Sequence, residues 1–245
     1  MPRKKTKPPA PPSAGTPRPA GAARVRDAGR SRGAILKAAI AVFSELGLGG
    51  ARVDEIARRA GVNKALLYHY FDNKDGLFVA ALECVYEEIR AAEASLDLES
   101  LGPEAAIQRL VDFTFDHFLA HPEFITLLNS ENLHRARHLE KSGSVRQLHL
   151  PLVARLKKLL ARGAREGVFR DGVDPVELYI SVASLGYFYL SNAHTLSTVF
   201  SRDLMGPAAL RRRRKHMRDV ILGYLRPMEK RVRSAGPGRE GRGKA

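Results

Sequence analysis

The sequence has little of several features that mark other classes of protein. One cysteine, Cys84, stands among 245 residues, which excludes an internal disulfide, and its helical setting favours packing over redox chemistry. No apolar run approaches the roughly 20 residues that span a bilayer, and no apolar signal-peptide core lies near the N-terminus. Sustained alternation of apolar and polar residues is also missing, so no sheet is expected. These absences predict a cytoplasmic, all-α protein with no membrane partner.

Positive charge is abundant but unevenly placed. The formal net charge is +15, yet residues 1–32 hold nine Lys or Arg against one acid, and residues 226–245 hold seven basic against two acidic residues. The middle of the chain is therefore nearly neutral. Pro, Ala and Gly dominate the start, so we expect a disordered basic arm at 1–30 and a disordered basic tail at 228–245. The arm is either a solubilising extension or a source of phosphate contacts that add affinity without reading bases.

The stretch Val53–Phe71, VDEIARRAGVNKALLYHYF, predicts two short helices hinged on one glycine. Gly61 suits the left-handed residue that ends many helices, and Asn63 is a good N-cap for a second helix over Lys64–Phe71. Two such short helices need a third across them. An apolar stripe from Ile35 to Leu46 supplies it, so the pattern predicts a helix-turn-helix unit.

Further helices are expected along the rest of the chain, because apolar positions keep helical spacing and proline and glycine punctuate them. They cover Lys74–Ala94, Glu104–Ala120, Pro122–Leu133, Ser144–Glu166, Pro175–Ala193 and Pro207–Leu225. The first of these is long enough to carry a displacement from a second domain to the first. The last two have wide apolar faces, which form either intramolecular core or the contact with a second copy of the chain.

Two segments resemble one family closely. Gly61–Lys64 and Leu67–Leu77 fit the pattern IA-x-x-AGV, LY-x-x-F, N-K-x-x-L behind an amphipathic helix, which is similar to the TetR family of transcriptional regulators. The resemblance covers about residues 31–78, and the later helices resemble the family's second domain more loosely. It implies a DNA-binding domain at 31–78, followed by a helical effector-binding and dimerisation domain at 79–227.

The resemblance also implies a homodimer that places two recognition helices in successive major grooves of a double-stranded DNA operator. A small-molecule effector would release this repressor. By matched position the DNA-binding residues are Arg52, Asn63, Lys64, Ala65, Tyr68, His69, Tyr70 and Lys74. Lys64 can donate to guanine, and Lys74 would hold a phosphate. Where the family places Thr or Ser before Val53, this chain has Ala51 and Arg52, so a weaker cap is expected for that helix.

The implied effector pocket should be apolar with a few polar groups. Its candidate lining residues are Phe113, Phe118, Phe124, Leu128, Asn129, Tyr187, Tyr189, Asn192 and His194. No catalytic residue, cofactor or metal is expected. Two other readings stay open: a non-specific basic nucleic-acid-binding protein, suggested by the charged ends, and a helical metal-binding enzyme, suggested by the spacing of His117 with His121 and of His134 with His138.

Overall fold

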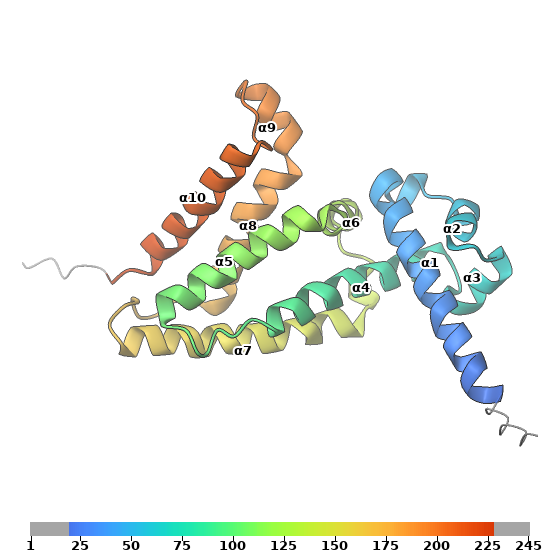
Figure 1. Cartoon of the computed structure of the whole chain (residues 1–245), viewed down its shortest axis with the longest axis horizontal. Helices are drawn as coiled ribbons and strands as arrows, with labels where there is room; N and C mark the ends of the chain where they lie inside the picture. Colours follow the sequence, from blue (N-terminus) through green and yellow to red (C-terminus); the bar gives the residue numbers. More distant parts are fainter. Residues whose placement is uncertain (1–19, 228–245) are drawn as a thin grey trace, which may run out of the picture.

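The computed structural model describes the backbone of residues 20–227 and the side chains of residues 29–227. Every regular element in that part is helical, as expected (Figure 1). The elements are α1 (Ala20–Gly50), α2 (Val53–Ala60), α3 (Lys64–Phe71), α4 (Lys74–Ala94), α5 (Pro103–Ala120), α6 (Pro122–Leu133), a 3₁₀ turn η1 (Leu139–Lys141), α7 (Gly143–Arg165), α8 (Pro175–Ser191), α9 (Ala193–Val199) and α10 (Pro207–Leu225).

Helix boundaries agree with the sequence expectation wherever a local signal sets them. Gly47 has φ 67° and breaks the regular geometry of α1, and Gly61 has φ 68° after α2. The expectation missed α9, because Asn192 ends α8 and the chain turns into a further short helix before Gly206. A helical segment of this length carries too few residues for a clear periodic pattern.

The described backbone begins inside the expected arm. A disordered stretch at residues 1–30 was expected, but the backbone is already helical from Ala20. The alanines at the start of this stretch favour helix, and extending an existing helix avoids the cost of nucleating a new one. Residues 1–19 and the expected tail at 228–245 lie outside the described residues.

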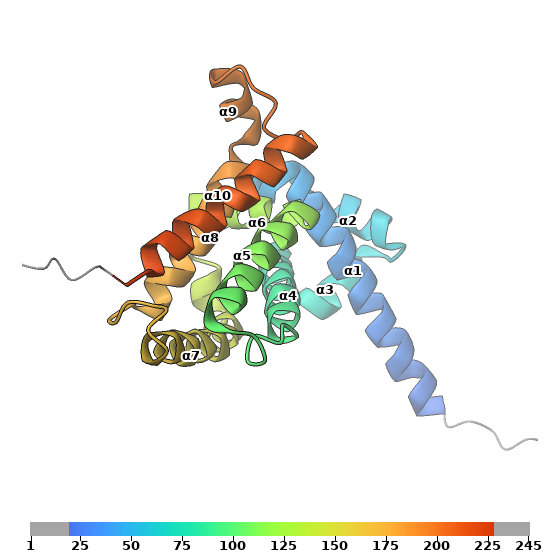
Figure 2. The ribbon, with the colours of Figure 1, turned by 60° about the vertical axis from the view of Figure 1, so that its left-hand side comes forward.

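The first three helices form a small unit at one end of the molecule (Figure 1). Its core consists of side chains from α1, α2 and α3, including Ile35, Phe43, Ile56 and Leu67, each at most 1% exposed. Helix α4 leaves this unit and runs into the second group of helices, where α5 and α7 lie along it. Helices α8 and α10 pack against α5 on the far side (Figure 2).

The buried core does not stop at the expected domain boundary near residue 78. One cluster joins the first three helices to α4, and it continues into α6 through Phe124, Ile125 and Leu127. A second cluster is built from α5, α7, α8 and α10. The first unit is therefore packed directly on α4 and α6, so a movement of either helix is transmitted to it.

Helix α1 is the most apolar long segment that the hydropathy test picks out in the described part of the chain. Among the described residues, the segment Gly29–Gly50 of α1 is long and apolar enough to span a membrane by length and composition. Its side chains Ile35, Ala39 and Val42 have no exposed surface and lie in the core of the first unit, whereas Leu46 is 51% exposed. The core helix of a water-exposed unit passes the same test.

Candidate nucleic-acid interface and ligand site

The turn between α2 and α3 is fixed by local hydrogen bonds. The amide of Val62 donates to the carbonyl of Ala57 (3.1 Å) and the amide of Gly61 donates to that of Arg58 (3.2 Å), a pattern that requires a left-handed residue at Gly61. The Asn63 side chain then accepts from the amide of Leu66 (2.7 Å). Asn63 is therefore occupied as the cap of α3.

The turn after α3 is equally constrained. Asp72 has φ 55°, and the Asn73 side chain accepts from the amide of Gly76 (2.8 Å). A Cβ added at Gly76 would lie 2.6 Å from the carbonyl oxygen of Phe71, so only glycine fits. The two turns hold α3 at a fixed angle, with its core side chain Leu67 buried.

The outer face of α3 carries the expected contact residues. Lys64, Ala65 and His69 are exposed, Tyr68 is 37% exposed, and Tyr70 is half-buried with its ring 5.5 Å from that of His69. These side chains form a compact face with hydrogen-bonding groups and one cation, which fits a major groove.

Two expected contact residues have partners inside the protein. Lys64 pairs with Asp54 of α2 at 2.9 Å, and this carboxylate raises the pKa of Lys64. The Lys74 ammonium donates to the carbonyls of Leu48 (2.9 Å) and Ala51 (3.3 Å), which ties the start of α4 to the turn before α2. An ammonium has three donors, so a phosphate contact by Lys74 remains a prediction.

The start of α2 is weakly capped, as expected. Arg52 occupies the N-cap position without a side-chain cap hydrogen bond, and its side chain is exposed. Sequence reasoning missed a second cation nearby. The guanidinium of Arg32, on α1, lies 5.3 Å from the ring centroid of Phe71, beside the end of α3. Arg32 lies at the start of the expected DNA-binding domain, 31–78, where no contact is expected from its position in the motif.

The expected ligand residues divide into two groups. Phe118 and Phe124 stack with ring centroids 5.5 Å apart, and Tyr187 meets Phe118 edge-on at 6.3 Å. The Tyr187 hydroxyl donates to Asn129, whose amide donates to Ser191 (3.0 Å). Leu128 packs against the same cluster. These residues meet where α5, α6 and α8 cross.

The remaining expected ligand residues are not all at that crossing. Phe113 packs on His117, with ring centroids 5.6 Å apart. Tyr189 donates to the carbonyl of Leu204 (2.6 Å), Asn192 donates to that of Phe188 (2.9 Å), and His194 is exposed on α9. The last three lie at the α8–α9 end of the domain and do not gather with Phe124.

Sequence reasoning missed a buried polar group at the centre of the second domain. Arg90 and Glu93 of α4 are 6% and 2% exposed, and Arg90 donates to the hydroxyl of Tyr179 on α8 (2.6 Å). His117 of α5 is also buried, and its burial lowers its pKa to about 4. A possible signal was the charged pair one turn apart on the α4 face that also carries Ile89.

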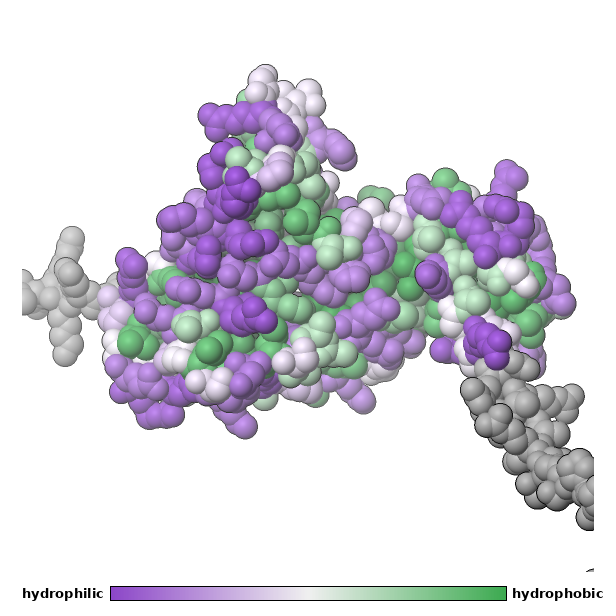
Figure 3. Space-filling model, viewed as in Figure 1, coloured by the Kyte–Doolittle hydropathy of each residue, from purple (hydrophilic) through white to green (hydrophobic). Residues whose placement is uncertain are grey.

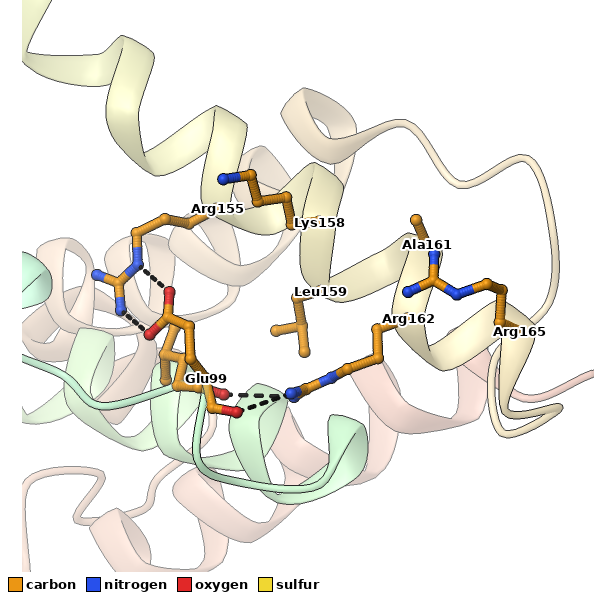
Figure 4. Close-up of a pocket in the computed structure, with 8 residues that line it drawn as sticks. Glu99, Arg155, Lys158, Leu159, Ala161, Arg162 and Arg165 are labelled. Atoms are coloured by element: carbon orange, nitrogen blue, oxygen red, sulfur yellow. Dashed lines mark hydrogen bonds and ion pairs between the residues drawn. The ribbon is translucent and has the colours of Figure 1, made fainter.

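Two grooves run beside α7. One, of about 520 Å³, lies between α4 and α7 and has Arg90, Glu93 and Arg155 on its wall. The other, of about 370 Å³, is shown in Figure 4, where Arg155 is bidentate to Glu99. Arg162 there donates to backbone carbonyls of the loop before α5. The arginines of this second groove thus fasten a loop.

The histidine pairs do not assemble a metal site. His117 and His121 stack with ring centroids 4.4 Å apart, while His138 is bound to Glu131 through its Nδ1 (2.6 Å). Within residues 29–227 there is no group of three or more His, Cys, Asp or Glu side chains that could hold a metal ion. The spacing of these residues is explained by helix packing.

Comparisons with known proteins agree with this architecture. The family model described as bacterial regulatory proteins, TetR family, matches residues 35–81, and the model of the tetracycline-repressor-like C-terminal domain matches residues 103–221. The HTH-type transcriptional repressor NicS of Pseudomonas putida is 42% identical over 181 residues, which are 74% of this chain and 85% of the relative. The repressor SCO4008 of Streptomyces coelicolor is 33% identical over 159 residues, 64% of this chain and 78% of the relative.

Solved structures share the fold. The Streptomyces coelicolor transcriptional regulator SCO4942 superimposes with a TM-score of 0.61 at 22% identity, over 80% of this chain and 98% of the other. The hemolysin II transcriptional regulator HlyIIR superimposes with a TM-score of 0.56 at 21% identity, over 81% of this chain and 98% of the other. At this identity the likeness concerns the fold.

Proposed function

Because this chain belongs to the TetR family of bacterial transcriptional regulators, we propose that it is a cytoplasmic homodimeric repressor that a small-molecule effector releases from its operator. The observation that carries the proposal is the exposed face of α3 on a unit packed directly against α4 and α6. The relatives NicS and SCO4008 are both named as repressors, which supports repression over activation in this proposal.

In this proposal α3 enters the major groove of the operator. Tyr68 and His69 contact base edges or adjoining phosphates, Ala65 and Tyr70 lie at the edge of the contact, and Lys64 reaches DNA after leaving Asp54. Arg52 and Lys74 hold phosphates on either side, and Asn63 keeps the helix in place as its cap. The exposure of Lys64, Tyr68 and His69 on α3 supports the assignment.

In this proposal the homodimer interface is formed by α8 and α10. Both helices pack on α5, yet they leave large apolar side chains in solvent: Ile180 is 49% exposed on α8, and Val220 and Tyr224 are 41% and 43% exposed on α10. Figure 3 shows hydrophobic surface among hydrophilic side chains in this part of the molecule. Apolar stripes on two neighbouring helices suit a self-complementary contact with a second copy.

Helix α6 supplies a route from an effector to the DNA-binding unit. Its Phe124 stacks on Phe118 within the second domain, and its Thr126 shares a hydrogen bond of 2.7 Å with Ser44 of α1. The amide of Leu48 also donates to the Ser130 hydroxyl (3.5 Å). An effector that prefers one position of α6 would thereby bias the position of α1 and the spacing of the two recognition helices.

The DNA-binding proposal is tested by selecting an operator from random DNA with the full-length protein and measuring affinity for it and for a scrambled duplex. A specific complex is expected to be about 10³-fold or more tighter than the scrambled one. The variant Tyr68→Ala/His69→Ala should lose this preference while remaining dimeric. The matched control is Phe200→Ala/His194→Ala, which removes an exposed aromatic ring and an exposed imidazole from the α9 region. Unchanged preference in the α3 variant would refute the assignment.

The dimer is tested by analytical ultracentrifugation. Ile180→Glu places a charge in the proposed interface and should yield monomers with weakened operator binding, because a buried unpaired charge is costly. Leu133→Glu is the control, since Leu133 is 84% exposed and lies on α6, which is not part of the proposed interface. Monomeric wild-type protein, or a dimer untouched by Ile180→Glu, would refute this interface.

A further inference from the structure

Two buried charges on α4 are incompletely satisfied. Arg90 Nη1 and Glu93 Oε2 are 2.8 Å apart, and the two side chains are 5% and 2% exposed. Despite this contact, four atoms have no hydrogen-bond partner among the described residues: Arg90 Nε and Nη1, and both carboxylate oxygens of Glu93. Buried ionic groups are costly unless each of their donors and acceptors is paired. The arrangement therefore has unused hydrogen-bonding capacity around a cation.

Besides its ion pair with Glu93, Arg90 has aromatic neighbours. Its guanidinium lies 5.1 Å from the ring centroid of Tyr179 and donates to that hydroxyl. Tyr86 meets both His149 and Phe124 edge-on, with ring centroids 5.3 Å apart. Burial raises the pKa of Tyr86 to about 12 and lowers the pKa of His149, so both are neutral at pH 7. On its buried side Arg90 therefore has neutral aromatic neighbours that add no counterion.

The carboxyl that faces Arg90 is itself a weak counterion. Burial raises the pKa of Glu93 to about 7, against the opposing effect of Arg90 and Arg155. A carboxyl with a raised pKa is a weaker negative partner for Arg90 in a low-dielectric setting. An anion from outside would remove that deficit.

The groove between α4 and α7 gives access to this pair. Its volume of about 520 Å³ lies in the usual range for small-molecule sites, and Leu148 and Leu152 line it beside Arg90 and Glu93. Its other cation, Arg155, is committed to Glu99 and to the carbonyls of Glu93 and Leu96. One available cation suits a monoanion such as a carboxylate better than a phosphate, which would need more positive charge.

We propose that Arg90 binds the carboxylate of a small planar aromatic acid, which takes the place of the Glu93 carboxylate while its ring lies in the groove against Leu148 and Leu152. This inference rests on the proposed function, because it names the chemical class of the effector. Arg90 Nε and Nη1 have no hydrogen-bond partner, so a carboxylate can accept a charge-assisted hydrogen bond from either of them.

The test is calorimetry and thermal melting of the full-length protein without DNA. The probes are benzoate, 4-hydroxybenzoate and 2-naphthoate, each paired with its neutral amide. We expect at least one acid to raise Tm by roughly 5 °C at about 100-fold over its Kd, and its amide to have no such effect. If no acid raises Tm, or if each amide binds as well as its acid, the proposal is wrong.

Variants of the protein test whether the acid binds at Arg90. Arg90→Gln should weaken the acid at least tenfold, whereas Glu93→Gln at pH 8 should tighten it, because the internal competitor is removed. Arg146→Gln, at an exposed arginine of α7, is the matched control and should bind like the wild type. The double variant Arg90→Gln/Glu93→Gln leaves no unpaired charge, so it keeps the test valid if Arg90→Gln fails to fold. Equal affinity in the double variant would overturn the proposal.

Operator affinity, measured separately with and without the acid, distinguishes a failure of the carboxylate site from a failure of the proposed function. If the acid binds through Arg90 and leaves operator affinity unchanged, the carboxylate site stands and effector-controlled release fails. If no acid binds and the protein still prefers its operator, the carboxylate site fails and the DNA-binding role stands.

Discussion

The pH dependence of stability should change when Glu93 is replaced by Gln. Burial, opposed by Arg90 and Arg155, raises the folded-state pKa of Glu93 from 4.5 to about 7. The folded protein then binds a proton that the unfolded chain has released, so the stabilising contribution is fully present below pH 4.5 and is lost as pH rises through 7. A shift of this size corresponds to roughly 3 kcal/mol.

His117 opposes this effect. Burial, aided by the charges of His121 and Arg90, lowers its pKa from 6.5 to about 4, so its contribution is present above pH 6.5 and is lost as pH falls through 4. The two shifts are similar in size and opposite in sign. Between pH 4.5 and 6.5 they should largely cancel in the wild-type protein, and His149, whose pKa is lowered by burial, acts in the same direction as His117.

Urea denaturation at several pH values and one fixed protomer concentration tests this reasoning. The free energy of unfolding of Glu93→Gln, relative to wild type, should rise by roughly 3 kcal/mol between pH 4.5 and pH 8. Any constant offset from leaving Arg90 without its carboxylate does not affect this difference, because arginine stays protonated throughout. Glu87→Gln, at an exposed glutamate of the same helix, should run parallel to wild type. A parallel curve for Glu93→Gln would refute the raised pKa.

Three further outcomes are expected. Asp54→Asn frees Lys64 from its 2.9 Å ion pair and should tighten operator binding by about fivefold or less at low salt, with a smaller gain at high salt, measured by fluorescence anisotropy. Arg32→Gln should lower the slope of log affinity against log salt by about 0.9 without changing sequence preference, whereas Lys158→Gln on α7 should leave the slope unchanged. Gly163→Ala should cost about 2 to 3 kcal/mol in thermal unfolding, because its Cβ would lie 2.0 Å from a ring carbon of Phe169; Phe169→Leu in the same chain should restore part of the loss.

Most of the fold could be predicted because local signals set it. Gly61 and Asn63 fix the α2–α3 turn through bonds to residues three to five positions away, and such signals are legible in one sequence. The all-α class followed from helical spacing alone. The composition of residues 1–30 predicts disorder, whereas the structure has a helical backbone from Ala20. Alanine propensity and the adjoining helix favour this extension.

The candidate sites depended on contacts between distant parts of the chain, which sequence spacing does not reveal. Lys74 reaches the carbonyls of Leu48 and Ala51, more than 20 positions earlier, and Arg90 reaches Tyr179, 89 positions later. A charged residue on a helix normally lies on a solvated face, so the sequence does not predict that Arg90 is buried. Aromatic residues were chosen as ligand candidates by type, and only those near the α5–α6 crossing gather in space.

The proposed DNA-binding face and the proposed carboxylate site are both connected to helix α4. Arg90 and Lys74 stand on the same helix, α4, which begins beside the recognition helix and ends at the proposed carboxylate site. Helix α6 packs against both α4 and α1, and Glu131 on α6 binds the imidazole of His138, whose ring meets Phe78 of α4 at 5.1 Å. A ligand that changes how α4 pairs with its neighbours therefore has two contiguous packed paths to α3. Because well-packed helices move as rigid bodies, a small displacement at Arg90 must be taken up at the far end of α4, where the recognition helix is attached.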